Sequence, residues 1–235
     1  MRSPAFRRGW RQVALSAALL CAMSGCVDSS AQTASRPPAT GGHPTPAAPP
    51  AGALVSSARK QIGVTVHYDP AYARIAYPGG DVPVSRGVCT DVVIRAFRTQ
   101  GMDLQRLVHE DMRAHFPKYP QNWGLRAPDR NIDHRRVPNL QTWFTRQGWS
   151  VAVADRAEHY RAGDLVTWML PGNLPHIGIV SDRRAASGDV PLIIHNIGRG
   201  AREENILFAY RITGHYRPRL RPVAPAPSDH AASAR

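Results

Sequence analysis

Residues 163–182, with the sequence GDLVTWMLPGNLPHIGIVSD, decide the class of fold. Residues 164–170 are apolar and rich in β-formers, and residues 176–181 continue in the same way from a histidine. The stretch 171–175 lies between them and contains proline, glycine and asparagine, which favour a tight turn. The sequence therefore predicts a β-hairpin here.

Helical patterns precede this hairpin, and further strand patterns follow it. Apolar residues recur at helical spacing in four segments, 54–62, 88–101, 103–116 and 138–148. Short strand patterns occupy residues 151–154, 192–195 and 209–216. Helices first and strands second indicate an α+β fold, in which N-terminal helices pack on an antiparallel sheet.

The N-terminal residues 1–25 have the pattern of an export signal. Arginines come first, and residues 13–23 then form an apolar segment too short to span a membrane. Small residues precede Cys26, which resembles the lipobox of bacterial lipoproteins and implies lipid attachment to the Cys26 sulfur. An ordinary secretory signal is the alternative. Both predict export, and the first predicts a membrane-anchored lipoprotein facing the periplasm or the outer cell surface.

The remaining chain divides by composition. Residues 26–52 are rich in proline and alanine and predict a tether. Residues 53–216 carry the periodic patterns and predict one domain, and residues 217–235 predict a flexible basic tail.

The composition limits the classes of partner. There are 30 Lys and Arg against 17 Asp and Glu, a formal net charge of +13. This charge suits an anionic envelope surface. Because the sequence holds no recognisable nucleic-acid module, we expect no nucleic-acid partner. Three cysteines without a C-x-x-C pair argue against a zinc knuckle, and we expect no metal and no organic cofactor.

Cys89 is the candidate nucleophile. Cys21 lies in the signal and Cys26 is the lipidation candidate, which leaves Cys89 as the single free thiol of an exported protein. It stands at the start of the helix predicted over 88–101, where free N–H groups and the helix dipole lower a thiol pKa. A buried, inert cysteine is the alternative.

Two histidines are candidates to serve this thiol. His176 opens the second strand of the hairpin and is the candidate base, and His195, near the end of the next strand, is the candidate that orients it. Asn196 is the rival for the orienting role, and a structural strand histidine is the rival interpretation of His176. Asp91, two residues after the cysteine, is interpreted as a partner of the helix dipole or of Arg95 on the solvent side.

The loop 131–136 is dense in charged side chains. Asp133 and Arg135 are candidates for substrate binding, since an arginine fork matches a carboxylate. A solvated brace of the loop is the equal alternative.

These pieces together resemble the NlpC-type cell-wall peptidases, bacterial relatives of papain. The pattern is a tyrosine with a Gly-Gly loop, a cysteine that starts a helix, Gly-Asp on a strand, His-φ-Gly-φ on the next strand, and a third polar residue. Here these are Tyr77 with Gly79-Gly80, Cys89, Gly163-Asp164, His176-Ile177-Gly178-Ile179 and His195. The sequence is closer to a divergent branch that is catalogued as a domain of unknown function.

The resemblance implies a papain-like, NlpC-like fold over about residues 53–216 and a monomeric cysteine peptidase or amidase. Its substrate is then the peptide stem of peptidoglycan, its bond an amide, and Tyr77 a substrate-binding residue. Two alternatives remain: a non-catalytic cell-wall-binding module on the same fold, and an acyltransferase or lipid hydrolase.

Overall fold

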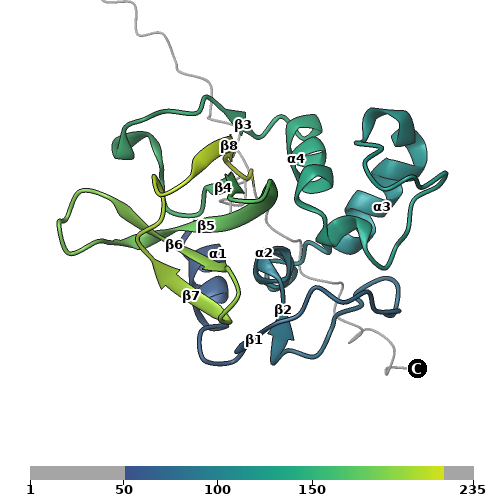
Figure 1. The fold of residues 1–235 in the computed structure, drawn as a ribbon, viewed down its shortest axis with the longest axis horizontal. Coiled ribbons are helices and arrows are strands. Elements are labelled where there is room, and N and C mark those ends of the chain that lie inside the picture. The colour runs from purple at the N-terminus through teal and green to yellow at the C-terminus, as the bar shows by residue number, and fades with distance from the viewer. Residues whose placement is uncertain (1–50, 220–235) are drawn as a thin grey trace, which may run out of the picture. The chain divides into compact units, whose positions relative to one another are not determined.

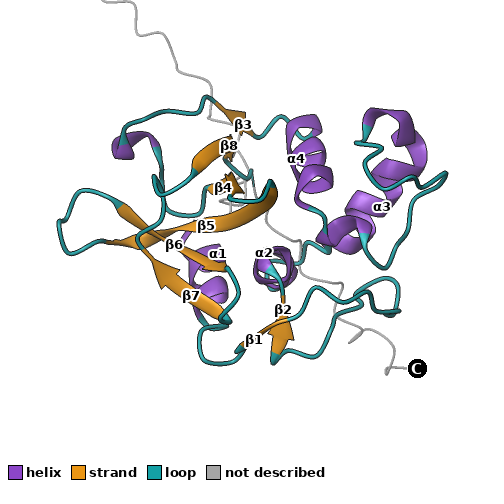
Figure 2. Cartoon of the chain, in the orientation of Figure 1, coloured by secondary structure: helices purple, strands orange, loops and turns teal. Residues whose placement is uncertain are grey.

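The computed structural model describes residues 51–219, and it contains helices followed by strands (Figures 1 and 2). The α-helices are α1 (Ala51–Arg59), α2 (Cys89–Arg98), α3 (Leu104–His115) and α4 (Val137–Arg146). The strands of the main sheet are β3 (Ser150–Val151), β4 (Leu165–Leu170), β5 (Leu174–Arg184), β6 (Pro191–Asn196), β7 (Ala201–Glu204) and β8 (Arg211–Tyr216). β1 (His67–Tyr68) and β2 (Arg86–Gly87) form a separate parallel pair.

The main sheet has the order β3-β8-β4-β5-β6-β7, and each neighbouring pair is antiparallel. The predicted α+β class and the β4–β5 hairpin are confirmed. The sequence did not predict β7, which pairs with β6 and places Arg202 opposite His195.

Helices cover one face of this sheet. α2 packs against β5, β6 and α1 (Figure 1). The apolar core on this side joins residues such as Val92, Phe97 and Leu140 of the helices to Ile177 and Ile194 of the sheet. A second core on the other face contains Val166, Trp168, Val180, Ile193 and Leu207. The two cores follow from the alternation of side chains along each strand.

The first helix begins and ends three residues earlier than the sequence predicts. Leu54, Val55 and Ala58 are buried as expected, but α1 ends at Arg59, and residue Ile62 is 38% exposed. Gln61 takes the inward position instead and donates a hydrogen bond to the Val92 carbonyl oxygen. The inward position after Ala58 is thus held by the polar side chain of Gln61, whose hydrogen bond to the backbone makes its burial possible.

The other helices lie close to their predicted bounds. Asp103 caps α3 by accepting a hydrogen bond from the Gln105 N–H. Pro138 lies in the first turn of α4, and Gly148 follows its end with a φ of +70°. Across residues 51–219, no helix has the length and hydropathy needed to cross a membrane.

Candidate active site

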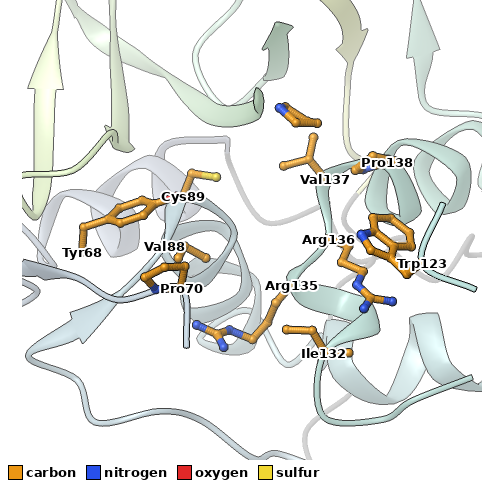
Figure 3. A pocket seen from close by; sticks show the side chains of 11 residues that line it. Tyr68, Pro70, Val88, Cys89, Trp123, Ile132, Arg135, Arg136, Val137 and Pro138 are labelled. Atoms are coloured by element: carbon orange, nitrogen blue, oxygen red, sulfur yellow. The ribbon is translucent and has the colours of Figure 1, made fainter. Parts of the chain in front are cut away.

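Cys89 is the first residue of α2 and borders a pocket of about 200 Å³. Its sulfur points into this pocket, with the ring of Tyr68 beside it (Figure 3). The apolar part of the lining consists of Tyr68, Pro70, Val88, Ile132, Val137, Pro138 and Pro175. Trp123, Arg135 and Arg136 add an aromatic ring and two guanidinium groups. The site is therefore an apolar pocket with a thiol and a cationic wall.

A buried ion pair fixes the start of α2. Asp91 accepts a hydrogen bond from the Val88 N–H at 2.6 Å, and both its carboxylate oxygens receive Arg135 nitrogens at 2.9 Å. Arg135 also donates to the Asp69 and Ala71 carbonyl oxygens. The expectation that Asp91 faces solvent beside Arg95 is wrong, since its side chain is 4% exposed. Arg95 pairs with Asp81 instead.

Burial dominates the chemistry of the thiol. The pKa of Cys89 is raised to about 12 because burial disfavours the thiolate, and the carboxylate of Asp91 adds to this effect. The N–H groups of Ile177, Thr90 and Cys89 itself lower the pKa, but by less. The expectation of a lowered pKa is therefore wrong for the resting protein. The N–H donors of the helix start are present as predicted, and desolvation outweighs them.

The two candidate histidines contact each other. His176 Nε2 and His195 Nδ1 are 3.1 Å apart, and both side chains are buried. Burial lowers the pKa of His176 to about 3, so this imidazole is neutral near pH 7. Burial also lowers the pKa of His195, while Glu204 opposes that shift. Asn196, the rival for the orienting role, donates to the Gly87 carbonyl oxygen.

The hairpin brings the backbone on either side of His176 to the start of α2, while the His176 ring lies 5.9 Å from that of Trp168 in the second core. Pro175, directly before His176, lines the same pocket as Cys89, and the N–H of Ile177, directly after it, interacts with the thiol. Gly178 allows β5 and β6 to approach closely. A Cβ added there would lie 2.5 Å from Ile193 Cγ2 and 3.2 Å from His195 Cβ. The His-φ-Gly-φ pattern thus has a steric reason in this fold.

Glu204 extends the histidine pair beyond His195. His195 Nε2 lies 3.1 Å from Glu204 Oε2, and the Glu204 side chain is 38% exposed. The sequence analysis missed this residue together with β7, whose residues Arg202, Glu203 and Glu204 are all charged. Charged residues are poor strand formers, so no strand pattern marks the segment.

The structure places the tyrosine candidate elsewhere. Tyr77 packs edge-on against His109, with ring centroids 5.1 Å apart, and the Arg130 guanidinium lies 5.7 Å from its ring centroid. It does not line the pocket of Cys89, whereas Tyr68 does. Tyr68 was missed because the irregular segment from Asp69 to Ser85 gives no period from which to predict a facing residue.

The charged side chains of the loop 131–136 have different roles. Arg135 is the buried brace of Asp91, so most of its N–H groups already have acceptors. Asp133 is also buried, and burial raises its pKa to about 6. Arg136 lies 4.0 Å over the Trp123 ring, and its contact with Asp133 is 3.3 Å long. Arg136 is thus the cation of the pocket with the weaker internal pairing.

Two further candidates concern metal and lipid. Within residues 51–219, no three His, Cys, Asp or Glu side chains are grouped so as to hold a metal ion. Cys26, the lipidation candidate, lies outside the described residues, as do the rest of the predicted signal and most of the tether.

Comparison with known proteins identifies the family. The model of a family described as a domain of unknown function (DUF1287) matches residues 55–218. The chain is also 58% identical over 165 residues to the uncharacterized protein YijF of Escherichia coli K12, which covers 70% of this chain and 80% of that protein. No solved structure matches. The chain belongs to the DUF1287 family.

Proposed function

We propose that this protein is an exported cysteine hydrolase with a papain-like, NlpC-like fold that cleaves an amide bond in the peptide part of peptidoglycan. One observation carries the proposal: a thiol at a helix start faces a pocket and lies against the β5 segment that contains His176, one member of a hydrogen-bonded histidine pair. A nucleophile, a base and a residue that orients the base are the minimal set for acyl transfer through a covalent intermediate.

The mechanism starts from a neutral thiol and a neutral imidazole, because burial disfavours both charged forms. His176 Nε2 contacts His195, and we assign the other ring nitrogen, Nδ1, as the acceptor of the thiol proton. As the proton moves, Cys89 Sγ bonds to the substrate carbonyl carbon, and the carbonyl oxygen becomes an oxyanion. The Cys89 N–H at the helix start is the candidate donor to that oxyanion.

The second half of the cycle returns the enzyme to its resting state. The carbon–nitrogen bond breaks, the His176 imidazolium gives its proton to the leaving amine, and a thioester remains. Water then loses a proton to His176 as its oxygen bonds to the thioester carbon. The carbon–sulfur bond breaks, the sulfur takes back the proton, and a free carboxylic acid leaves.

The pocket favours a substrate with a carboxylate beside an apolar group. Arg136 and Trp123 form one wall, and Tyr68, Pro70 and Val88 form another. Peptidoglycan stems carry free carboxylates, and a guanidinium binds a carboxylate through two parallel hydrogen bonds. We include the export signal and a lipid on Cys26 in the proposal, since a membrane anchor places a monomeric hydrolase next to this substrate.

Mass analysis of digested sacculi tests the proposal. Purified wild-type protein is expected to release peptide fragments with one new amine and one new carboxylate per cut, and Cys89→Ala protein is expected to release none. A His215→Ala variant serves as the control for a substitution in the same sheet. Unchanged sacculi with the wild-type protein, or equal cutting by Cys89→Ala protein, would contradict the proposal.

A non-catalytic binding module is the second candidate, and the raised pKa of the Cys89 thiol favours it. It predicts that wild-type and Cys89→Ala proteins bind sacculi equally and that neither cuts them.

The apolar lining of the pocket is the observation that supports the third candidate, an acyltransferase or lipid hydrolase. Incubation of the wild-type and Cys89→Ala proteins with acylated lipids distinguishes this candidate from the other two, because only this candidate predicts release or transfer of an acyl chain.

A further inference from the structure

Glu204 stands at the end of a hydrogen-bonded chain that runs through both histidines. His176 Nε2 is 3.1 Å from His195 Nδ1, and His195 Nε2 is 3.1 Å from Glu204 Oε2. The carboxylate oxygen only accepts hydrogen bonds, so it requires the proton on His195 Nε2. His195 Nδ1 then has a lone pair and accepts from His176 Nε2–H.

We infer that Glu204 is a positioning residue that fixes the tautomers of both histidines and so keeps His176 Nδ1 free of a proton. This role rests on the proposed function, because it matters for catalysis only if His176 is the base. Without Glu204, the hydrogen bond between the histidines can reverse. His195 Nδ1–H would then donate to His176 Nε2, and the proton of His176 would occupy Nδ1, where it blocks transfer from the thiol.

The placement of Glu204 depends on the edge strand β7. Ile193 is the register partner of Glu204, and His195 is the partner of Arg202, so these four side chains share one face of the sheet. Glu203 points to the other face and contacts Arg59 and Ser181. The charged or titratable groups beside the histidine pair on this face are thus Arg202 and Glu204 from β7.

Nitrogen-15 NMR of the histidine rings tests this inference without any substrate. In the wild-type protein, His195 is expected as the Nε2–H tautomer and His176 with a bare Nδ1. Glu204→Ala is expected to shift both rings toward the reversed tautomers. Glu204→Gln is expected to keep more of the wild-type tautomers, since its amide oxygen still accepts a hydrogen bond. Glu203→Gln is the matched control on the same strand and is expected to leave both rings unchanged.

The kinetic arm uses the sacculus assay. Loss of the tautomer-fixing carboxylate costs about 10⁴-fold in kcat in a serine protease triad. We expect a loss of about 10²-fold for Glu204→Ala with little change in KM, because Glu204 is half-exposed and water replaces it in part. Partial rescue by Glu204→Gln is expected, whereas a purely structural role predicts parallel losses of folding and activity.

The outcomes separate this inference from the proposed function. Wild-type tautomers and wild-type kcat in Glu204→Ala would overturn the role of Glu204. A wild-type protein that leaves sacculi intact, with tautomers that still shift in Glu204→Ala, would overturn the proposed function and support the role of Glu204 in fixing the rings.

Discussion

The main sheet holds a histidine–carboxylate pair near each of its ends. On β6 and β7, His195 contacts Glu204 at 3.1 Å, and His195 also contacts His176. On β8, near the other edge, His215 contacts Asp164 at 2.7 Å. Both histidines are buried, but their carboxylates differ, since the Glu204 side chain is 38% exposed and that of Asp164 is 2% exposed.

The surroundings of the two pairs explain the difference. Asp164 also binds Arg217 through two nitrogens and the Arg161 N–H, and the second ring nitrogen of His215 faces the Ala152 carbonyl oxygen. The hydrogen bonds of that pair thus connect His215 of β8 to Ala152, directly after β3, and to Asp164, directly before β4. The His195 pair instead continues to His176, and the N–H of the next residue, Ile177, interacts with the thiol of Cys89, the only cysteine of the described residues. A buried histidine–carboxylate pair therefore indicates catalysis only when it is connected to a reactive group.

The largest expected difference between the two pairs is in activity. His176→Ala removes the base, and general-base catalysis contributes about 10²- to 10⁴-fold in rate. We therefore expect kcat on peptidoglycan peptides to fall by that factor in His176→Ala protein and to change by less than about threefold in folded His215→Ala protein. Steady-state kinetics with thermal unfolding curves for both variants makes the measurement. Equal losses in the two would remove the distinction drawn between the ends of the sheet.

The free energy of unfolding is expected to fall more when Asp164 is replaced than when Glu204 is replaced, which is the opposite of the order expected for activity. Asp164→Ala leaves Arg217 and His215 without their buried anion, and breaking a buried pair costs about 3–5 kcal/mol. Since the Arg217 side chain is one-third exposed, we expect the lower end of this range. Glu204→Ala is expected to cost about 1 kcal/mol or less, because its half-exposed carboxylate gains only a surface-type pair. Urea unfolding of both variants checks the ranking, and a greater loss in Glu204→Ala would reverse it.

The thiol is expected to react slowly in the folded state. The thiolate is the nucleophile, and a pKa near 12 leaves far less of it at pH 8 than in free cysteine. We expect iodoacetamide at pH 8 to alkylate Cys89 about 10³-fold more slowly than free cysteine, in proportion to the thiolate fraction. Mass analysis of the Cys89 peptide over time measures the rate. Denaturation should restore the free rate. Fast native alkylation at pH 6 that disappears in His176→Ala would instead show a preformed thiolate–imidazolium pair.

The sequence predicted those parts of the site that local patterns specify. The helix that begins at Cys89 follows from its apolar spacing, and the strand that begins at His176 follows from the turn before it. Asp91 lay beyond such reasoning, because its partner Arg135 is 44 residues away and only the folded chain joins them. The pairing of Asp91 with Arg135 also shows why a polar residue in the first turn of a helix need not face solvent.

The remaining gaps have the same physical origin. Glu204 was missed because a short edge strand made of charged residues has no hydrophobic period. Tyr68 was missed because it lies at the end of an irregular segment, where backbone turns rather than periodicity decide which side chain faces the pocket. The papain-like assignment stays a prediction, while the α+β class and the antiparallel sheet are confirmed.

The smallest expected effect concerns acid stability and compares a histidine of the site with one outside it. Burial lowers the pKa of both His176 and His134 to about 3, from about 6.5 in an unfolded chain. Between pH 3 and pH 6.5 each of these histidines is protonated in the unfolded chain but neutral in the folded protein. The stability that each neutral imidazole contributes is therefore fully present above pH 6.5 and is lost as the pH falls toward 3. From pH 7 to pH 5, each histidine is expected to cost about 2 kcal/mol of the free energy of unfolding.

The His134→Gln variant tests this contribution, because the buried Nδ1 of His134 has no hydrogen-bond partner that the substitution would remove. Urea unfolding at pH 7 and pH 5 should show that the variant loses about 2 kcal/mol less between the two pH values than the wild-type protein does. Since His134 is outside the histidine chain, the same variant should keep wild-type ring tautomers at His176 and His195. A loss between the two pH values that is unchanged in His134→Gln would show that His134 is already protonated in the folded protein at pH 5.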